Sequence, residues 1–470
     1  MTPLRIEHDA FGPVEIPADR YWGAQTQRAA GVFDVGTERF AACLLHAFGL
    51  QKIAAARANA RCGALDAALA EKIVAAAEEV SRGLFDDHFP LTVWQTGSGT
   101  QTNMNANEVI ANRANELLGQ PLGTKSPVHP NDHVNASQSS NDSFPTVMHI
   151  AAVMELTNRL IPSLVVLKDA LNERARAFAD ATKVARTHLM DAVPMTMGQA
   201  FEAFAWQVGS GIERLQDALP RLLLVAQGGT AAGTGLNAPR DFDVLFCEEI
   251  GKLTGLRFKP HPCKFEGMSG HDALVELSGA LNVVATSLMK IANDIRWMGS
   301  GPRCGIGELV VPDDGLTSSI MPGKRNPTIA EVLAQAAMQV VGNHVTVTMA
   351  GTSGNFELNV AKPVLIHNVL QSIRVLAGSS RVFAGKLVAR LDIDRERLAL
   401  NLSNALLSVT VLNPVLGYDK VACITRTAVE RNITPREAAV ALGYLSAEEY
   451  DRLVDPLRMS KAKNQLKSPP

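Results

Sequence analysis

The sequence has few features that would indicate a metal centre, a disulfide framework or a nucleic-acid partner. Its 470 residues include six cysteines, which are scattered and form no C-x-x-C pair, and no H-E-x-x-H motif is present. In a chain of this length, such cysteines indicate reduced thiols rather than disulfides or a zinc site. The net charge of -2 gives no reason to expect nucleic acid or an anionic membrane as a partner. We therefore expect no metal site and no bound nucleic acid.

Long hydrophobic runs are also absent. No uninterrupted apolar run approaches the length of a bilayer span, and Leu222 to Ala226 is typical of the longest. The first residues, MTPLRIEHDAFG, mix charges with apolar side chains and lack the apolar core of a signal peptide. These features predict a cytoplasmic protein that does not enter a membrane.

Aromatic residues make up only 5% of the chain, whereas alanine and leucine are abundant. This composition favours close-packed helices over a β-sandwich, whose strands draw on aromatic and β-branched residues. The hydrophobic share of 46% and the charged share of 20% are ordinary for a globular protein. We therefore predict a mainly all-α fold.

The clearest helical pattern is a set of seven apolar residues whose spacings alternate between four and three. That spacing places all seven on one face of a helix. The other faces are also weakly polar, and a helix that is apolar nearly all round belongs in the middle of a bundle. Gly299, Gly301 and Pro302 are expected to end it. The seven residues are Leu277, Leu281, Val284, Leu288, Ile291, Ile295 and Met298.

Similar patterns predict four more long helices, so the chain is expected to contain an elongated bundle. They cover residues 145–177, 195–226, 328–350 and 363–390. We predict three domains: residues 1–140 with shorter helices and site loops, residues 141–362 with the central long-helix bundle, and residues 363–470 as a small helical domain. The tail from Ser460 to Pro470 is basic and ends in proline, which predicts disorder.

Four loops between these helices are rich in Gly, Ser, Thr and Asn and are nearly uncharged. Any one of them is explained by ordinary turn chemistry. Four such loops between apolar helices together provide many hydroxyl, amide and backbone N–H groups. We interpret them as a binding site for a small dicarboxylate. They cover residues 95–107, 129–143, 227–237 and 315–327.

The segment GLTSSIMPGKRNP superficially resembles a phosphate-binding loop. A Walker A motif requires G-x-x-x-x-G-K-[ST], but Gly323 and Lys324 are followed here by Arg325, and Ser318 stands where the first glycine belongs. We therefore reject the nucleotide interpretation. The GGTAAGTG run at residues 228–235 lacks the apolar strand that precedes a dinucleotide loop, and we assign it to substrate contact or packing.

What remains at residues 315–327 is a Ser/Gly loop in front of a helix. Pro327 suits the first helical position, with Asn326 as the cap. This arrangement would place Ser318, Ser319 and Lys324 near a helix N-terminus, where anions are favoured. From the residues alone, an ordinary capped loop with a solvated lysine fits equally well.

Two further side chains could take part in acid–base chemistry. His188, in the segment RTHLMDAVP, could titrate near neutrality, although a single histidine is more often structural. Glu331 is ambiguous because it also fits a T-x-x-E capping box with Thr328.

Together these motifs resemble the fumarase/aspartase superfamily, and class II fumarases in particular, over nearly the whole chain. The resemblance begins at PADRYWGAQTQRA and ends at LNPVLGYDKVA. At four places where class II fumarases and aspartases differ, this chain has the fumarase residues: GSGTQ (97–101), HPND (129–132), RTH (186–188) and MPGK (321–324). The segments HVN (133–135) and DAVPMT (191–196) are closer to aspartases, so an aspartate ammonia-lyase, or a lyase on another substituted succinate, stays the alternative.

The chain also departs from the family pattern. Thr317 stands where the signature usually has glycine, which is expected to stiffen the loop. Arg325 follows the lysine where fumarases often have valine, and the approach to the loop at residues 312–316 differs as well.

The resemblance implies a three-domain fold whose central helices form the core of a homotetramer with active sites shared between subunits. It implies reversible hydration of fumarate to L-malate in the tricarboxylic acid cycle, without a cofactor or metal. Ser318 would be the base that removes the proton from C3 of malate, and Lys324 would help to stabilise its alkoxide. His188 would protonate the leaving hydroxyl, with Glu331 orienting its imidazole.

The resemblance further implies which residues hold the substrate carboxylates: Ser98, Gly99, Thr100, Ser139, Ser140, Asn141, Thr187, Ser319, Lys324, Arg325 and Asn326. A secondary anion site would consist of His129, Pro130, Asn131 and Asp132. A third hypothesis, a helical protein that has lost catalysis, is disfavoured because Ser318, His188, Lys324 and Glu331 are all present.

Overall fold

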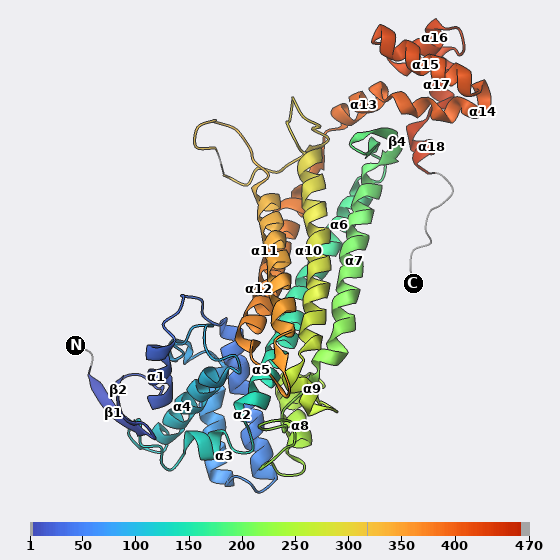
Figure 1. Cartoon of the computed structure of the whole chain (residues 1–470). Helices are drawn as coiled ribbons and strands as arrows, with labels where there is room; N and C mark the ends of the chain where they lie inside the picture. Colours follow the sequence, from blue (N-terminus) through green and yellow to red (C-terminus); the bar gives the residue numbers. More distant parts are fainter. Residues whose placement is uncertain (1–2, 317, 462–470) are drawn as a thin grey trace. The chain divides into compact units, whose positions relative to one another are not determined.

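The computed structural model describes residues 3–316 and 318–461, and it is built mainly from helices (Figure 1). Thr317 and most of the tail predicted to be disordered therefore lie outside the described residues. The chain divides into two compact units. Unit 1 comprises Met1–Pro162, Gly211–Thr286 and Ala336–Ala377, and unit 2 comprises Ser163–Ser210, Ser287–Gln335 and Gly378–Pro470. The division into three domains at residues 140 and 362 remains a prediction.

The five long helices occur close to their predicted positions. α5 (Ser140–Glu155) continues through η3 (Leu156–Leu160) into α6 (Ile161–Ala177). The other four are α7 (Met197–Leu222), α10 (Asp272–Met298), α11 (Thr328–Gly351) and α12 (Lys362–Val382). Their boundaries differ from the predicted ones by a few residues, except that the last pattern, 363–390, is α-helical only to Val382 and continues as the π-helix η4 (Phe383–Leu387) and the 3-10 helix η5 (Val388–Arg390).

The predicted apolar face of α10 is confirmed. All seven residues of the pattern are buried, none more than 8% exposed. Complete burial of a leucine or isoleucine contributes about 1.5–3 kcal/mol relative to exposure, so this face accounts for much of the stabilisation that packing gives the helix. The opposite side of the helix is partly exposed, at Val283 and Trp297.

Unit 1 is organised around α2 (Ala42–Arg61), which packs against α3 (Ala67–Ser81), α5 and α8 (Phe242–Thr254) (Figure 1). Small residues permit the close approach: a Cβ on Gly49 would lie 2.5 Å from the backbone nitrogen of Ser81. Three polar side chains of α2, those of Gln51, Lys52 and Asn59, are fully buried. α4 (Thr100–Glu116) packs on α3, α5 and α1 (Ala24–Val32).

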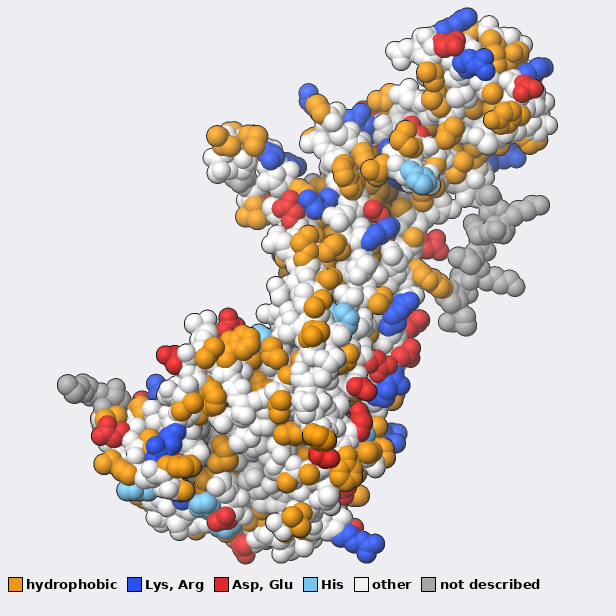
Figure 2. Space-filling model, in the orientation of Figure 1, with side chains coloured by type: hydrophobic (Ala, Val, Ile, Leu, Met, Phe, Trp, Pro, Cys, Tyr) orange, Lys and Arg blue, Asp and Glu red, His pale blue; other side chains and the backbone are white. Residues whose placement is uncertain are grey.

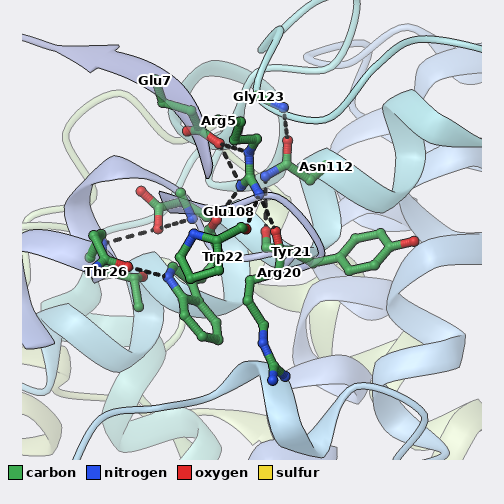
Figure 3. Close-up of polar contacts among 12 residues, drawn as sticks. Arg5, Glu7, Arg20, Tyr21, Trp22, Thr26, Glu108, Asn112 and Gly123 are labelled. Carbon is green, nitrogen blue, oxygen red and sulfur yellow. Dashed lines mark hydrogen bonds and ion pairs between the residues drawn. The ribbon is translucent and has the colours of Figure 1, made fainter. Parts of the chain in front are cut away.

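A buried carboxylate joins α4 to the N-terminal segment (Figure 3). Glu108 of α4 accepts hydrogen bonds from the backbone nitrogens of Gly23, Gln25 and Thr26, at 2.9, 2.9 and 3.1 Å. These nitrogens stand at the N-terminus of α1, where a negative charge is stabilising. Nearby, Arg5 binds the carbonyl oxygens of Pro17, Arg20 and Trp22. The bonds of Glu108 thus attach the middle of α4 to the start of α1, in addition to the packing of its apolar face.

The remaining elements of unit 1 are short. They are the antiparallel hairpin of β1 (Leu4–Asp9) and β2 (Gly12–Pro17), the parallel pair β5 (Leu224–Val225) and β6 (Lys259–Pro260), the hairpin β8 (Gly354–Asn355) and β9 (Leu358–Asn359), and the helical segments η1 (Asp86–His88), η2 (Pro130–Val134) and α9 (Lys264–Ser269).

Unit 2 contains the hairpin of β3 (Thr182–Thr187) and β4 (Met190–Thr196) and the paired strands β7 (Leu309–Val310) and β10 (Asp392–Ile393). α13 (Arg395–Asn404) packs on β3. The C-terminal helices are η6 (Leu406–Leu412), α14 (Asn413–Leu416), α15 (Tyr418–Arg431), α16 (Pro435–Ala441), α17 (Ala447–Leu453) and α18 (Pro456–Ser460). They share a small apolar core that includes Leu412, Ile424, Ala438 and Tyr450.

Among the described residues, two helices are long and apolar enough to cross a membrane by length and composition alone. They are Ser140–Ala177 and Asp272–Met298, in which a stretch of 18 residues has a mean hydropathy of 1.5 and 1.3, respectively. These helices do not contradict the prediction about apolar runs, because polar residues interrupt the apolar sequence of both. One of these polar residues is Ser278 of α10, which is buried and hydrogen-bonded to His344.

Candidate functional site

In unit 1, the predicted residues Ser98, Gly99 and Thr100 lie where α4 begins. Gly99 precedes the helix in the left-handed region, with φ of 74°, a conformation that glycine adopts without strain. A Cβ there would lie 2.2 Å from the Phe144 ring, and one on Gly97 would lie 1.3 Å from the carbonyl oxygen of Val360. The two glycines thus let the loop pack closely and fix Ser98 between them. The hydroxyls of Ser98 and Thr100 are 2.7 Å apart.

Ser139, Ser140 and Asn141 form the start of α5. Ser139 caps the helix in a capping box with Asp142, and Ser140 and Asn141 occupy its first turn. Asn103 of α4 donates to the Ser140 hydroxyl at 2.9 Å, which joins this segment to α4. Unit 1 therefore brings both predicted segments together at the N-termini of two helices, where anions are favoured.

The loop at residues 227–237 contacts the second of these segments. The Asn141 amide donates to the carbonyl oxygen of Ala231 at 2.8 Å. Gly228 and Thr230 donate their backbone N–H groups to the Asp142 carboxylate, both at 2.9 Å. Three of the four predicted loops are thus connected within unit 1. The GGTAAGTG run has a packing role, as one of its two predicted alternatives proposed.

The residues of the predicted secondary anion site form hydrogen bonds with one another. His129 precedes η2, and its Nδ1 accepts backbone hydrogen bonds from Asn131 and Asp132, each at 3.2 Å. The same nitrogen lies 3.3 Å from the carboxylate of Asp132. Pro130 is buried. The two backbone donors are therefore bound by the imidazole of their own segment, and a role in anion binding remains a prediction.

In unit 2, Thr187 and His188 lie at the tip of the β3–β4 hairpin. His188 and Leu189 have φ of 57° and 62°, which is the geometry of a two-residue type I′ turn. The turn exposes both side chains, and Leu189 is 75% exposed. In the part of the chain that the structure describes, no hydrogen bond or ion pair joins His188 to Glu331.

A buried carboxylate holds the first strand of this hairpin. Glu308 lies 2.7 Å from Arg186 and 3.5 Å from Lys183, and it accepts from Asn401 at 3.1 Å. Burial raises the pKa of Glu308, but Arg186 and Lys183 outweigh that effect and leave the pKa below its usual value. Glu308 is therefore ionised at neutral pH and anchors the strand that leads to His188.

The Ser318 loop, residues 311–327, precedes α11 in unit 2. The Ser318 hydroxyl accepts backbone N–H groups from Met321 at 3.1 Å and Ile320 at 3.4 Å. Ser319 and Lys324 are exposed, and Arg325 forms an ion pair with Asp313 at 3.2 Å. The loop thus presents Ser318 with two backbone donors directed at its oxygen.

The start of α11 differs from its prediction by one residue. The first helical hydrogen bond runs from the Glu331 nitrogen to the carbonyl oxygen of Pro327, so Pro327 is the cap and Asn326 precedes it. Thr328 donates its hydroxyl to Asp314, and this bond replaces the capping box considered for Thr328 and Glu331. Glu331 lies 4.0 Å from Arg296.

Sequence reasoning missed three buried charged residues beside the predicted ones: Asp142, Lys52 and Glu308. Asp142 was detectable, since the segment SSND fits a capping box. Lys52 and Glu308 have partners far away in the sequence, and no local pattern identifies them. Among the described residues, no group of three or more His, Cys, Asp or Glu side chains is placed to bind a metal ion.

Comparison with known proteins gives one consistent result. A family model described as "Lyase" matches residues 12–342, and one described as "Fumarase C C-terminus" matches residues 409–461. The chain is 54% identical to the mitochondrial fumarate hydratase of Rhizopus oryzae over 466 residues, covering 99% of this chain and 94% of that one. It is 52% identical to the class II fumarate hydratase of Caulobacter vibrioides, covering 98% and 99%.

Solved structures agree with these relatives. The crystal structure of class II fumarase from Schistosoma mansoni matches with a TM-score of 0.95 and 40% identity, covering 98% of this chain and 100% of that one. The fumarate lyase:delta crystallin of Brucella melitensis, solved bound to cobalt, matches with a TM-score of 0.93 and 39% identity, covering 97% and 100%. These matches assign the two apolar helices to this fold rather than to a membrane.

Proposed function

Because the chain belongs to the class II fumarase family of lyases, we propose that it is a fumarate hydratase, which adds water reversibly to fumarate to form L-malate. The observation that carries the proposal is the identity of more than half the residues with fumarate hydratases over nearly the full length of both chains. The ammonia-lyase alternative is not favoured. The aspartase-like segment DAVPMT falls within β4, which is hairpin scaffold.

Ser318 is the base that removes the proton from C3 of malate. A serine hydroxyl is weakly acidic, so its alkoxide needs stabilisation. The backbone N–H groups of Ile320 and Met321 already point at this oxygen, and hydrogen bonds to a charged form lower the pKa of the group that carries it. Lys324, on the same loop, adds a positive charge for the alkoxide and for the dianionic intermediate.

His188 supplies the proton to the hydroxyl that leaves C2, directly or through a water. The hairpin places it in an exposed turn, where an imidazole can reach a substrate. Glu331 orients this imidazole, and the proposed assembly brings the two residues together from different subunits. This assignment gives each residue a role in proton transfer.

The substrate carboxylates are held by neutral donors and one or two cations. Ser98, Thr100 and the segment Ser139–Asn141 offer hydroxyls, an amide and the backbone N–H groups of two helix N-termini. The remaining contacts come from Gly99, Thr187, Ser319, Lys324, Arg325 and Asn326. Donors of this kind bind an anion without a metal or a cofactor, and we propose that none is needed.

A homotetramer with sites shared between subunits completes this arrangement. Apolar side chains are exposed along α11 and on the outer faces of α10, and Figure 2 shows one face of the molecule with many exposed hydrophobic groups. A large exposed apolar surface marks a protein–protein interface. The exposed residues of α11 are Val332, Met338, Val341, Val345 and Met349.

The proposed place of action is the tricarboxylic acid cycle, in the cytoplasm. Relatives include proteins named mitochondrial as well as bacterial class II enzymes, so fractionation of the native cells is the direct test of the location. A mitochondrial or other organellar fraction would overturn it.

The activity is tested by proton NMR of the purified protein with L-malate and, separately, with L-aspartate, both with a strong chelator. Fumarate formed from malate alone supports the hydratase and its independence of a removable metal. Fumarate formed from aspartate alone would overturn the proposal in favour of an ammonia-lyase. No product from either would exclude both activities, and loss of the malate reaction only on adding chelator would contradict the metal-free mechanism.

A further inference from the structure

A single buried carboxylate links two of the site loops in unit 1. Asp142 is 0% exposed. Its Oδ2 accepts the backbone N–H groups of Gly228 and Thr230, both at 2.9 Å, and the side-chain amide of Gln227 at 3.2 Å. Its Oδ1 accepts the backbone N–H of Ser139 at 2.9 Å. The four donors belong to residues 227–230 and to the residue that caps α5, so this carboxylate fixes the separation of the two segments.

A buried ammonium secures the other side of the same segment. Lys52 of α2 is also 0% exposed, and its Nζ donates to Asn135 Oδ1 at 3.2 Å and Gln138 Oε1 at 2.9 Å. Asn135 Oδ1 accepts as well from Asn103 and Asn107 of α4, each at 3.2 Å. Through Asn135, the lysine therefore joins α2 and α4 to the residues that precede Ser139.

Asp142 and Lys52 carry opposite charges, and both are fully buried. Burial raises the pKa of Asp142 to about 6, and hydrogen bonds from Ser139, Thr230 and Gly228, together with the charge of Lys52, act against that rise. Burial lowers the pKa of Lys52 to about 7, and the charge of Asp142 acts against that fall. Removing two such groups from water is unfavourable, and apolar residues of similar volume often serve stability at least as well. Stability alone therefore gives no reason for charged residues at these positions.

The location of the hydrogen bonds of Asp142 and Lys52 gives a reason for charged residues at these two positions. Every hydrogen bond of Asp142 described above ends on a segment that adjoins Ser139, Ser140 and Asn141, and those three residues are the ones proposed to hold a substrate carboxylate. Asn103 reaches both Asn135 and the Ser140 hydroxyl. A displacement of a substrate-binding group by about 1 Å can cost on the order of a hundredfold in catalytic efficiency, kcat/KM, so a rigid support under this segment has functional value.

We propose that Asp142 and Lys52 are positioning residues, which hold the segment Ser139–Asn141 against residues 228–231 and α4 so that its donors are pre-organised for a substrate carboxylate. The inference rests on the proposed function. Neither residue contacts substrate. Both act through the backbone and side chains that do.

The first test is Asp142→Asn, measured by steady-state kinetics with L-malate and by hydrogen exchange. The asparagine amide can still accept from Ser139 but turns an N–H group toward the donors of Gly228 and Thr230. We expect KM to rise about tenfold or more while kcat changes by less than about threefold, because binding is lost equally in the ground and transition states. Exchange should increase at residues 139–143 and 228–231.

Glu108→Gln is the matched control. Glu108 is also a buried carboxylate that accepts three backbone N–H groups, but those belong to the start of α1 (Figure 3). This variant should lose a comparable amount of thermal stability and show faster exchange at residues 23–27, with KM unchanged. Equal increases of KM in both variants would overturn the inference, because a general loss of structure would then explain them.

Lys52→Met is the second variant, and it decides the question if Asp142→Asn fails to fold. It removes the ammonium but keeps the apolar stem, and Asn135 and Gln138 keep other donors. KM should rise, and exchange should increase at residues 135–140 but not at 228–231. An unchanged KM in this variant, with wild-type enzyme active, would contradict the role of Lys52.

The two proposals can fail separately. If the wild-type protein does not hydrate fumarate, the proposed function fails, and the exchange measurements still report whether Asp142 holds the two segments. If the wild-type protein is active and Asp142→Asn leaves both KM and exchange unchanged, only the positioning role is overturned.

Discussion

Ser318 illustrates how the residues around a weak base can strengthen it. Its oxygen faces two backbone N–H groups of its own loop, and these stabilise an alkoxide more than a neutral hydroxyl. The side chain is only partly buried, so its removal leaves no cavity in a packed core. A substitution of Ser318 can therefore change the reaction rate without changing the stability of the fold.

We expect Ser318→Ala to lower kcat for malate dehydration by about 10²–10⁴-fold, the usual range for a residue in proton transfer. Circular dichroism and the unfolding midpoint should stay within error of the wild type. The rate is followed by the absorbance of fumarate, with Ser353→Ala, a change of a partly buried serine near the end of α11, as the control. Activity close to the wild type would remove Ser318 from the role of base.

A buried histidine outside the site makes stability depend on pH. His149 is almost fully buried and its Nδ1 lies 2.9 Å from the carbonyl oxygen of Leu222. Burial lowers its pKa from 6.5 to about 4, with the backbone carbonyl groups acting against the change. At this residue the unfolded chain therefore binds more protons than the folded chain between pH 6.5 and 4, so the contribution of His149 to stability falls as the pH falls through that window.

The difference between the two pKa values of His149, 6.5 and about 4, corresponds to roughly 3 kcal/mol of unfolding free energy lost by pH 4 and below. His149→Asn keeps a donor for the Leu222 carbonyl but cannot take up a proton. Urea unfolding at pH 7.0 and 4.5 should therefore show a smaller pH dependence in this variant. His8→Asn, at an exposed position of β1, should behave like the wild type, and equal slopes for all three proteins would rule out His149 as the cause.

At the scale of elements, the hairpin that carries His188 depends on one carboxylate. Glu308 is 0% exposed and faces two cations, Arg186 and Lys183, in the first strand. Its loss would leave both cations without that partner. Removing one partner of a buried ion pair lowers the free energy of unfolding by more than the intact pair contributes to it, because an uncompensated buried charge remains.

Glu308→Ala should lower the unfolding free energy by about 3–5 kcal/mol. It should also speed hydrogen exchange in residues 182–196 and reduce kcat, since His188 would no longer be held at a fixed place. Asp180→Ala is the control, because Asp180 forms an exposed ion pair with Arg395, and such pairs contribute at most about 1 kcal/mol. If both variants are equally stable, Glu308 is not the anchor of the hairpin.

Elements also show what the sequence could and could not predict. The face of α10 was predictable because burial repeats every three to four residues along one helix. The cap of α11 was misplaced by one residue, and the capping box considered for Thr328 is absent because the Thr328 hydroxyl donates to Asp314 instead. The turn at His188 and Leu189 carries no glycine or asparagine to signal its left-handed conformation, so only the three-dimensional structure reveals that His188 lies in an exposed two-residue turn.

In the candidate site, too, the sequence predicted the residues that belong to a local pattern and missed those that depend on distant partners. Ser98, Ser139 and Ser318 lie in polar loops that the composition of the sequence identifies, and the family resemblance assigned them roles. Lys52 and Glu308 stand in segments with no distinguishing local pattern, and their importance depends on partners 83 and 122 residues away. Such long-range polar pairs are decided by the packing of helices, which a single sequence does not specify.

At the scale of the whole molecule, the open question is which chains contribute to one site. His188 and Glu331 are not joined within the described part of one chain, and α11 exposes an apolar row that includes Val341 and Val345. Both features fit the proposed homotetramer, in which residues from different subunits meet. Closed symmetric assemblies repeat each interface, so every site would be completed in the same way.

Hybrid tetramers test this directly. Ser318→Ala and His188→Asn should each be almost inactive alone. If the two residues of one site come from different subunits, unfolding and refolding an equal mixture should restore about one quarter of wild-type activity, since each site then has even chances of an intact serine and an intact histidine. Refolding each variant separately before mixing is the control and should restore none. If the co-refolded mixture forms tetramers but stays inactive, both residues of each site belong to one chain, and the shared site is wrong.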